Sequence, residues 1–243
     1  MNDRKDIPKE EGEQIIDGER IALILNRLRR EAASITVYVP GIESEGKTFI
    51  LEVDPEAGLF SIDRIFPLEV QRAFAKAGRL QATAFLRSGA RVMFFAEVSH
   101  FLEDASGAAI VCPIPDTIHY HQLREYFRVP LPPDLKSTIQ LFESGNEVIA
   151  EGTLIDLSIG GVGAMVKSSK PIEDGHLFPR CKITLPPVLP ALQTGLEIRR
   201  AVPAQGTFRI GGRFVGLSGA NLRQLERAIA ELERILLKRN WRA

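Results

Sequence analysis

Two stretches of the chain combine side chains that could bind an anionic ligand. Arg124 and Arg128 stand four positions apart, and the later segment 156–161 reads Asp-Leu-Ser-Ile-Gly-Gly. Guanidinium groups hydrogen bond to phosphate oxygens and to the acceptor edges of purines, whereas a carboxylate such as that of Asp156 accepts only from donors, for example guanine N1–H and N2–H. An anionic ligand that also carries such a base suits both sets of groups, so the sequence indicates a nucleotide.

The arginine pair is followed closely by prolines at positions 130, 132 and 133, which favour extended chain. Arg128 is therefore expected outside a helix, and the four-residue spacing does not by itself align it with Arg124. A loop that wraps around a ligand could still direct both guanidinium groups inward. The alternative is that Arg128 pairs with a surface carboxylate while Arg124 is solvated.

The second stretch combines polar side chains with glycines at the expected rim of a strand. A strand is predicted to end just before Asp156, and we expect positive φ at Gly160 and Gly161, where the chain turns into the next strand. Asp156 and Ser158 would then lie on the same side of the chain. The alternative is a local Asx-type turn, which needs no ligand.

The first half of the chain contains the elements of a small antiparallel barrel. A helical period begins at Glu19, and a second helix is predicted from Leu68 to Lys76. Short strands with alternating apolar residues and turn residues between them are predicted at 35–39, 48–53, 59–63, 80–86, 91–98 and 108–112. Regular short strands of this kind are typical of a barrel.

The second half repeats this architecture and ends in a helix. Strands are predicted at 138–142, 147–155, 162–166, 181–185, 196–202 and 207–215. Beyond Ser218, a plausible N-cap, apolar residues recur at helical spacing: Leu222, Leu225, Ile229, Leu232 and Leu236. This apolar stripe could pack on its own barrel or on a neighbouring subunit, which leaves a homodimer open.

The predicted fold class is therefore mainly β, with two small antiparallel β-barrels in tandem and a long terminal α-helix. At 243 residues the chain exceeds the usual size of one domain. We expect a flexible tail over residues 1–17, a first barrel over 18–113, an interdomain linker over 114–123, and a second barrel with its helix over 124–243.

The overall composition narrows the classes of partner. The formal net charge is +0, which argues against a nucleic-acid polymer as the partner. No signal-type N-terminus is evident, and no apolar run approaches the ~20 residues that span a bilayer, so we expect a cytoplasmic protein without membrane insertion.

Other reactive residues point to no further chemistry. Cys112 and Cys181 are the only cysteines and are expected to be buried free thiols. His119 and His121 would share one face of a strand, but no third ligand of suitable type stands nearby, so no metal site is predicted. We find no nucleophile elbow, Walker loop or complete dinucleotide fingerprint, and therefore predict neither an enzyme nor a cofactor.

The paired motifs Arg124-x-x-x-Arg128 and Asp156-x-Ser158-x-Gly160-Gly161 resemble the RxxxR and DxSxxG motifs of the PilZ domain, the bacterial cyclic di-GMP receptor module. The later segment 212–217 and the terminal helix are similar to that family's closing strand and helix. Residues 19–112 resemble, at the level of pattern, the N-terminal barrel of YcgR-type proteins, the flagellar brake subfamily.

The resemblance implies a ligand site made of Arg124, Arg128, Asp156, Ser158, Gly160, Gly161 and Gly163. The arginines would bind guanine faces or edges and phosphates, while the aspartate and serine would hold a guanine edge and a phosphate or ribose group. Gly161 would let the backbone approach closely, and Gly160 and Gly163 would shape the same turn. Arg213, on the predicted neighbouring strand, would be an additional contact.

One position departs from the commonest YcgR pattern. Leu123 stands where many members have a further arginine, directly before the first motif arginine. An arginine there would help to hold a second, intercalated cyclic di-GMP, and leucine offers no donor for it. The resemblance therefore implies one ligand molecule per chain.

The expected function is that of a cyclic di-GMP receptor whose arginine loop becomes ordered on binding and reorients the two domains. By the resemblance, its partners are flagellar motor proteins, it is recruited to the flagellar basal body, and its output is reduced motility. Two alternatives stay open: a PilZ adaptor that regulates exopolysaccharide synthesis, and a flavin-binding split-barrel oxidoreductase. A pull-down or motility phenotype would separate the first from the brake, and flavin absorbance would identify the second.

Overall fold

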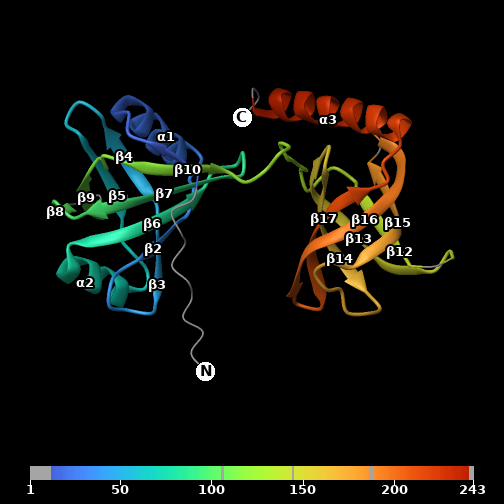
Figure 1. The fold of residues 1–243 in the computed structure, drawn as a ribbon, viewed down its shortest axis with the longest axis horizontal. Helices are drawn as coiled ribbons and strands as arrows, with labels where there is room; N and C mark the ends of the chain where they lie inside the picture. The colour runs from blue at the N-terminus through green and yellow to red at the C-terminus, as the bar shows by residue number, and fades with distance from the viewer. Residues whose placement is uncertain (1–11, 105–106, 144, 186–188, 241–243) are drawn as a thin grey trace. The chain divides into compact units, whose positions relative to one another are not determined.

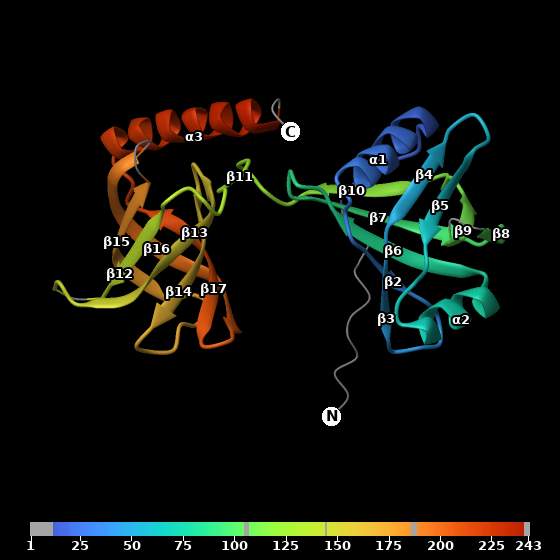
Figure 2. The ribbon, with the colours of Figure 1, turned by 180° about the vertical axis from the view of Figure 1, so that it is seen from behind.

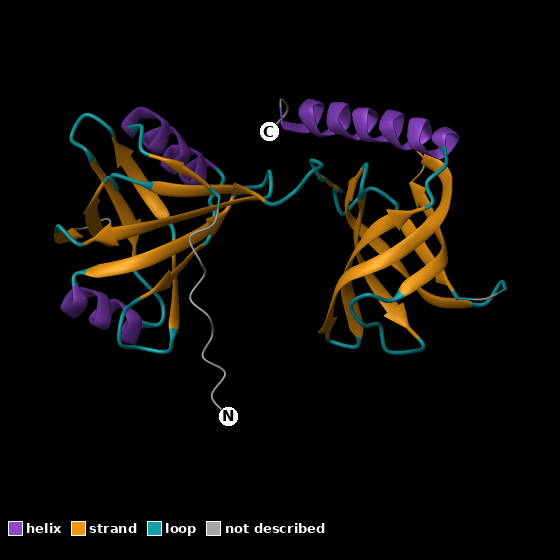
Figure 3. Ribbon diagram, viewed as in Figure 1, coloured by secondary structure: helices purple, strands orange, loops and turns teal. Residues whose placement is uncertain are grey.

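The computed structural model describes residues 12–104, 107–143, 145–185 and 189–240. The chain divides into two compact units, Met1–Arg124 and Glu125–Ala243, which we call the N-terminal unit and the C-terminal unit. Both consist mainly of antiparallel strands, with few helices, as the colouring of Figure 3 makes clear. The predicted fold class of two β-barrels in tandem is confirmed.

The N-terminal unit is a split barrel made of two sheets. A six-stranded sheet has the order β1-β10-β7-β6-β2-β3, and a four-stranded sheet has the order β4-β5-β9-β8. The strands of the first sheet are β1 (Glu13–Ile15), β2 (Ile35–Tyr38), β3 (Glu45–Thr48), β6 (Arg79–Phe85), β7 (Ala90–Glu97) and β10 (Ile118–Gln122). Those of the second are β4 (Ile50–Asp54), β5 (Leu59–Asp63), β8 (His100–Asp104) and β9 (Gly107–Pro113).

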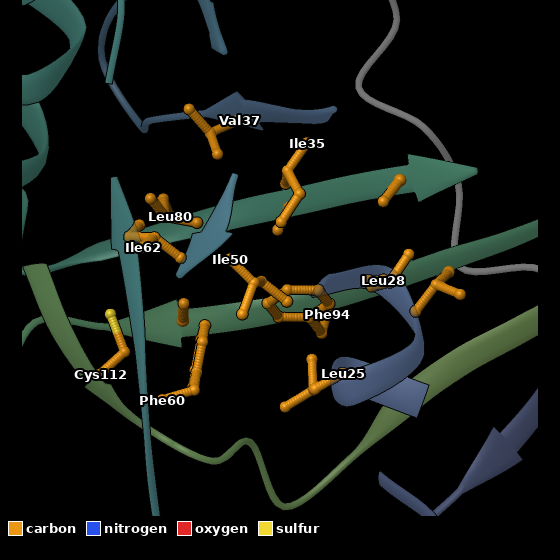
Figure 4. Close-up of a cluster of buried hydrophobic side chains, with 14 of the residues drawn as sticks. Leu25, Leu28, Ile35, Val37, Ile50, Phe60, Ile62, Leu80, Phe94 and Cys112 are labelled. Carbon is orange, nitrogen blue, oxygen red and sulfur yellow. The ribbon is translucent and has the colours of Figure 1, made fainter. Parts of the chain in front are cut away.

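Apolar side chains from both sheets and from α1 (Gly18–Arg30) fill one core, as Figure 4 shows. Phe60 of β5 and Phe94 of β7 meet edge to face, with their ring centroids 6.0 Å apart. Asp17 caps α1 by accepting a hydrogen bond of 2.7 Å from the backbone N–H of Arg20. The helical period predicted from Glu19 is therefore confirmed, as is the second helix, α2 (Leu68–Ala77).

Two predicted irregular segments contain strands instead. Residues 1–11 of the predicted tail lie outside the described residues, but Glu13–Ile15 forms β1, which pairs with β10. Strand β10 itself occupies Ile118–Gln122, within the predicted linker 114–123, and pairs with β7. These parts of the prediction were wrong because hydrogen bonds to strands distant in the sequence, rather than local apolar alternation, hold both segments in the sheet.

The C-terminal unit is a closed barrel. Its strands follow the order β13-β12-β15-β16-β17-β14, and β14 pairs back with β13 to close the ring. The strands are β12 (Thr138–Phe142), β13 (Val148–Ser158), β14 (Gly161–Ser168), β15 (Leu177–Leu185), β16 (Leu189–Ala204) and β17 (Thr207–Val215). The short β11 (Val129–Pro130) pairs with the last part of β13, opposite Leu157 and Asp156.

The terminal helix α3 (Gly219–Asn240) lies across one end of this barrel in both views (Figures 1 and 2). Ser218 is its N-cap, as predicted, because its hydroxyl accepts from the backbone N–H of Asn221 at 3.2 Å. Leu225 and Leu232 are fully buried in the core of the barrel. Of the two interpretations of the apolar stripe, packing on its own barrel is confirmed for these residues. Among the described residues, no helix has the length and apolar character needed to cross a membrane.

Candidate functional site

Strand β13 carries the predicted acidic half of the site. The strand continues through Ser158 instead of ending before Asp156, and its register shifts between Leu154 and Asp156, where a bulge occurs. Bulges redirect side chains and are frequent beside binding sites. Because Leu157 is buried in the core, its neighbours Asp156 and Ser158 project from the opposite face of the strand.

Asp156 holds an acceptor without a hydrogen-bond donor. Its Oδ1 atom is buried and makes no hydrogen bond. The positively charged guanidinium of Arg128 forms an ion pair with this carboxylate, with Nη1 3.7 Å from Oδ1. That separation allows attraction but exceeds hydrogen-bond length. A buried acceptor left in this state costs about 1–3 kcal/mol, which a ligand that donates a hydrogen bond would recover.

Arg128 is fixed beside Asp156 by the strand that follows it. Val129 and Pro130 form β11 and lie opposite Leu157 and Asp156 in the register with β13. Val129 is fully buried, so the chain at this point is held by packing as well as by pairing. The side chain of Arg128 keeps 39% of its area exposed. The carboxylate with which it pairs thus belongs to the second predicted motif rather than to an unrelated part of the surface.

Ser158 serves the turn that follows it. Its hydroxyl donates a hydrogen bond of 3.1 Å to the carbonyl oxygen of Gly161, and only 4% of the residue is exposed. This bond is local and needs no ligand, but it is not the Asx-type turn of the alternative interpretation, because the hydroxyl donates to a carbonyl instead of accepting from a backbone N–H. For a ligand to use this hydroxyl, it would have to donate to the serine oxygen or replace the turn's bond.

The glycines are required by close approach and not by positive φ. Neither Gly160 nor Gly161 has a positive φ, so that prediction was wrong. A Cβ atom on Gly161 would overlap the carbonyl oxygen of Gly212 on the neighbouring strand β17. A Cβ atom on Gly163 would lie 2.7 Å from Oδ2 of Asp156, because the two residues are partners in the β13–β14 register.

Tyr126 was not predicted to belong to the site. A Cβ atom on Gly160 would lie 2.6 Å from Cδ2 of Tyr126, so the tyrosine ring covers this glycine. The hydrogen bond and negative charge of Glu125 raise the pKa of the Tyr126 phenol. The signal in the sequence was an aromatic residue between two motif arginines together with a glycine pair that leaves room for its ring.

Arg213 lies beside Gly161 in the β14–β17 register, as predicted, but its side chain is directed to another group. Its Nη2 atom donates to Oε2 of Glu197 at 2.6 Å, and Arg199 approaches the same carboxylate at 2.8 Å. These hydrogen bonds, that of Arg213 first, lower the pKa of Glu197. A ligand contact from Arg213 would require it to leave this carboxylate.

Arg124 lies within the N-terminal unit, unlike the rest of the predicted set. Its Nη1 atom donates to the carbonyl oxygen of Arg87 at 3.2 Å. Leu123, beside it, is 49% exposed. The structure thus brings Arg128, Asp156 and Ser158 together with their glycines on the C-terminal unit, and it places Arg124 with the turn between β6 and β7.

The remaining reactive residues are separate from this group. Cys112 and Cys181 are buried free thiols, as predicted, and burial raises the pKa of each to about 12. In the described part of the chain, His119 and His121 belong to no group of three or more side chains that could hold a metal ion.

Comparison with known proteins gives matches over both units. The family model described as the PilZN domain of the flagellar regulator YcgR matches residues 15–120, and the PilZ domain model matches residues 122–231. The flagellar brake protein YcgR of Thioalkalivibrio sulfidiphilus is 31% identical over 240 residues, which cover 97% of this chain and 96% of that protein. The YcgR of Xanthomonas campestris is 26% identical, with 87% and 82% covered.

A solved structure has the same fold. The crystal structure of Escherichia coli YcgR in complex with c-di-GMP superposes with a TM-score of 0.70 and 23% sequence identity. The alignment covers 94% of this chain and 96% of that one. The order of two barrels with a terminal helix is therefore common to both proteins.

Proposed function

Since this chain belongs to the YcgR family of flagellar brake proteins, we propose that it is a receptor for cyclic di-GMP and that Arg124, Arg128, Asp156 and Ser158 hold the ligand. The family is one of regulators and not of enzymes, which argues against the flavin-dependent alternative. The proposal of this ligand rests on the residues of the site as well as on the relatives.

The observation that carries the proposal is the buried, unpartnered Oδ1 atom of Asp156 next to the guanidinium of Arg128. A guanine edge presents two adjacent N–H donors, and a phosphate presents charged acceptors, so one guanine nucleotide satisfies both groups at once. Charge-assisted hydrogen bonds of this kind are the stronger class. A ligand with only one of these two features would leave either the acceptor or the guanidinium without its best partner.

The glycines contribute to the site because they have no side chain. Gly163 leaves room for the Asp156 carboxylate, and Gly160 leaves room for the ring of Tyr126. Ser158 keeps the turn in place through its bond to Gly161 and retains lone pairs that could accept from a ribose hydroxyl. Arg213 would contact the ligand only if its guanidinium left the carboxylate of Glu197 and bound a ligand phosphate instead.

We further propose that one cyclic di-GMP binds per chain, because Leu123 supplies no donor for a second molecule.

Binding would order the segment between the two units and fix the relative placement of the barrels. The output would be reduced motility through flagellar motor proteins at the basal body. A PilZ adaptor of exopolysaccharide synthesis uses the same ligand, and it differs in the partner that a pull-down would recover. We also propose that the surface of α3 could form a homodimer.

Calorimetric titration with cyclic di-GMP tests the receptor function. Wild type should bind, and Arg128→Ala should bind at least about tenfold more weakly, since a hydrogen bond to a charged group contributes roughly 1.5–3 kcal/mol. Arg209→Ala is the matched control, because Arg209 is an exposed arginine on β17, opposite Met165 in the register. Undetectable binding by wild type would refute the receptor function, and equal affinity in Arg128→Ala would refute the site.

A further inference from the structure

The ring of Tyr126 lies on the turn between β13 and β14, and we call this the Tyr126–Gly160 contact. A Cβ atom on Gly160 would have three atoms of the ring as its nearest neighbours, with Cδ2 at 2.6 Å, Cε2 at 3.1 Å and Cγ at 3.6 Å. Both residues belong to the C-terminal unit. Because Gly160 has no positive φ, its backbone conformation does not require a glycine. The ring is therefore the reason that position 160 has no room for a side chain.

The turn beneath the ring is fixed to the barrel by hydrogen bonds. The carbonyl oxygen of Gly160 accepts from the backbone N–H of Phe214 on β17 at 3.0 Å. The hydroxyl of Ser158 donates to the carbonyl oxygen of Gly161, the first residue of β14, at 3.1 Å. Tyr126 thus rests on a part of the chain that is itself held in place and that carries Ser158.

The segment that carries Tyr126 also carries Arg128, two residues later. Beyond Arg128, strand β11 pairs with β13, and the backbone N–H of Leu131 donates to the carbonyl oxygen of Ile155 at 2.8 Å. Before Arg128, the ring of Tyr126 rests on Gly160. The backbone of Arg128 is therefore attached to the barrel on both sides, while its guanidinium keeps enough exposure to meet a ligand.

We propose that Tyr126 is a positioning residue that holds Arg128 beside Asp156 before the ligand arrives, and that Gly160 accommodates its ring. This inference rests on the proposed function. A ligand that meets an ordered Arg128 does not have to restrict the backbone around it, and such ordering lowers affinity. Without the ring, only β11 would hold this arginine, and binding would have to order residues 126–128 as well.

The ring carbons, and not the phenol oxygen, make this contact. The phenol of Tyr126 hydrogen bonds to Glu125, its neighbour in the same segment, whereas Cγ, Cδ2 and Cε2 lie against Gly160. Tyr126→Phe should therefore keep the contact and Tyr126→Ala should lose it. Phe127→Ala is the matched control, because Phe127 is the next residue along the chain and is 55% exposed, against 40% for Tyr126.

Two measurements on the full-length chain test the proposal. In calorimetric titration with cyclic di-GMP, Tyr126→Ala should raise the Kd about tenfold, the size expected from the ordering of one backbone residue. Tyr126→Phe and Phe127→Ala should bind as wild type does. In hydrogen exchange without ligand, followed by mass spectrometry, the backbone amides of Arg128 and Val129 should exchange faster in Tyr126→Ala than in wild type.

Gly160→Ala tests the same contact from the other side. The added methyl group would meet the ring, so this variant should raise the Kd to about the level of Tyr126→Ala. In the Tyr126→Ala background the ring is gone, and the same substitution should change the Kd by less than about twofold. Because Gly160→Ala displaces the ring without removing it, the test remains decisive if Tyr126→Ala folds poorly.

Three outcomes would overturn the inference. Wild-type affinity in Tyr126→Ala and Gly160→Ala would mean that the ring positions nothing. Weaker binding by Tyr126→Ala with unchanged hydrogen exchange would mean that Tyr126 contacts the ligand directly. An equal effect of Gly160→Ala with and without the ring would mean that this glycine serves the ligand and not Tyr126. Failure of wild type to bind cyclic di-GMP would instead refute the proposed function, so the two failures are distinguishable.

Discussion

The carboxylate of Asp156 occupies the space that a side chain would need at Gly163, its partner across the β13–β14 pair. A Cβ atom at position 163 would come within 2.7 Å of Oδ2 and 2.9 Å of Oδ1. The glycine therefore sets where the acidic side chain can lie, and the orientation of Asp156 beside Arg128 depends on a residue on the neighbouring strand.

Gly163→Ala should accordingly weaken cyclic di-GMP binding more than it weakens the fold. The added methyl group meets the end of a short side chain, which can turn away, so the barrel should survive with a small change in Tm. The displaced carboxylate should cost roughly 1.5–3 kcal/mol of binding free energy, or about 10- to 150-fold in Kd by calorimetry. Gly211→Ala is the control, because Gly211 is the β17 partner of Gly163 and its Cβ would meet no atom within 4 Å. Equal affinities in the two variants would contradict the argument.

Asp156→Ala should lower affinity without lowering stability. The variant removes a buried acceptor that has no donor in the free protein, whereas the attraction to Arg128 that it also removes is worth only about 0–1 kcal/mol at this exposure. Chemical unfolding should therefore give an unchanged or higher free energy of unfolding, while the Kd for cyclic di-GMP rises at least about tenfold.

Asp174→Ala is the control for both measurements, because it should lower stability and leave ligand affinity unchanged. Oδ1 of Asp174 accepts from the backbone N–H of Ala201 at 2.7 Å, so its removal leaves a donor without a partner. That variant should be less stable by about 0.5–1.5 kcal/mol, because the hydrogen bond is exposed and water can reach the freed N–H, and it should bind the ligand as wild type does. Clear destabilisation by Asp156→Ala would show that its carboxylate serves the fold rather than a ligand.

The features that the sequence predicts correctly are those that depend on local patterns. Ser218 and the apolar period after it define α3, because capping and helical spacing act within a few residues. Arg128 and Asp156 could be assigned to one site only by motif, and the structure brings them to 3.7 Å through the pairing of β11 with β13. That these two residues bind a ligand stays a prediction.

The errors share one physical cause. Strand β10, with the sequence Ile-His-Tyr-His-Gln, has little apolar alternation and is held by pairing with β7 and β1. Gly161 avoids the carbonyl oxygen of Gly212, which lies on a strand far along the chain. Arg124 rests on Gly89, again distant in sequence. Each of these contacts is non-local, and a single sequence carries no direct record of them.

The stability of the chain should fall at alkaline pH through its two thiols. Burial raises the pKa of Cys112 and Cys181 to about 12, whereas the pKa of an unfolded cysteine is about 8.5. A folded-state pKa above the unfolded value gives stability that is complete below about pH 8.5 and is lost as the pH rises toward 12. Each thiol should contribute a loss of at most about 1.4 kcal/mol per pH unit in that window.

Guanidinium chloride unfolding at pH 7.5 and at pH 10 measures this loss. The double variant Cys112→Ala and Cys181→Ala isolates the thiols, because tyrosines and lysines titrate equally in both proteins. The difference in unfolding free energy between the two pH values should be smaller for the double variant. Identical differences would mean that the thiols are not protected from ionisation in the folded chain.

Leu123→Arg should change the number of ligands bound. Leu123 is 49% exposed and adjoins Arg124, so a longer polar side chain fits there without disturbing a core. A guanidinium at this position adds donors in a planar fork, which can hold the phosphate of a second cyclic di-GMP stacked on the first. Calorimetry should give one ligand per chain for wild type and two for the variant. Leu123→Gln, which is polar but lacks the charged fork, should keep the wild-type value. Two ligands bound to wild type would show that leucine does not limit the stoichiometry, and one ligand bound to Leu123→Arg would show that this position does not set it.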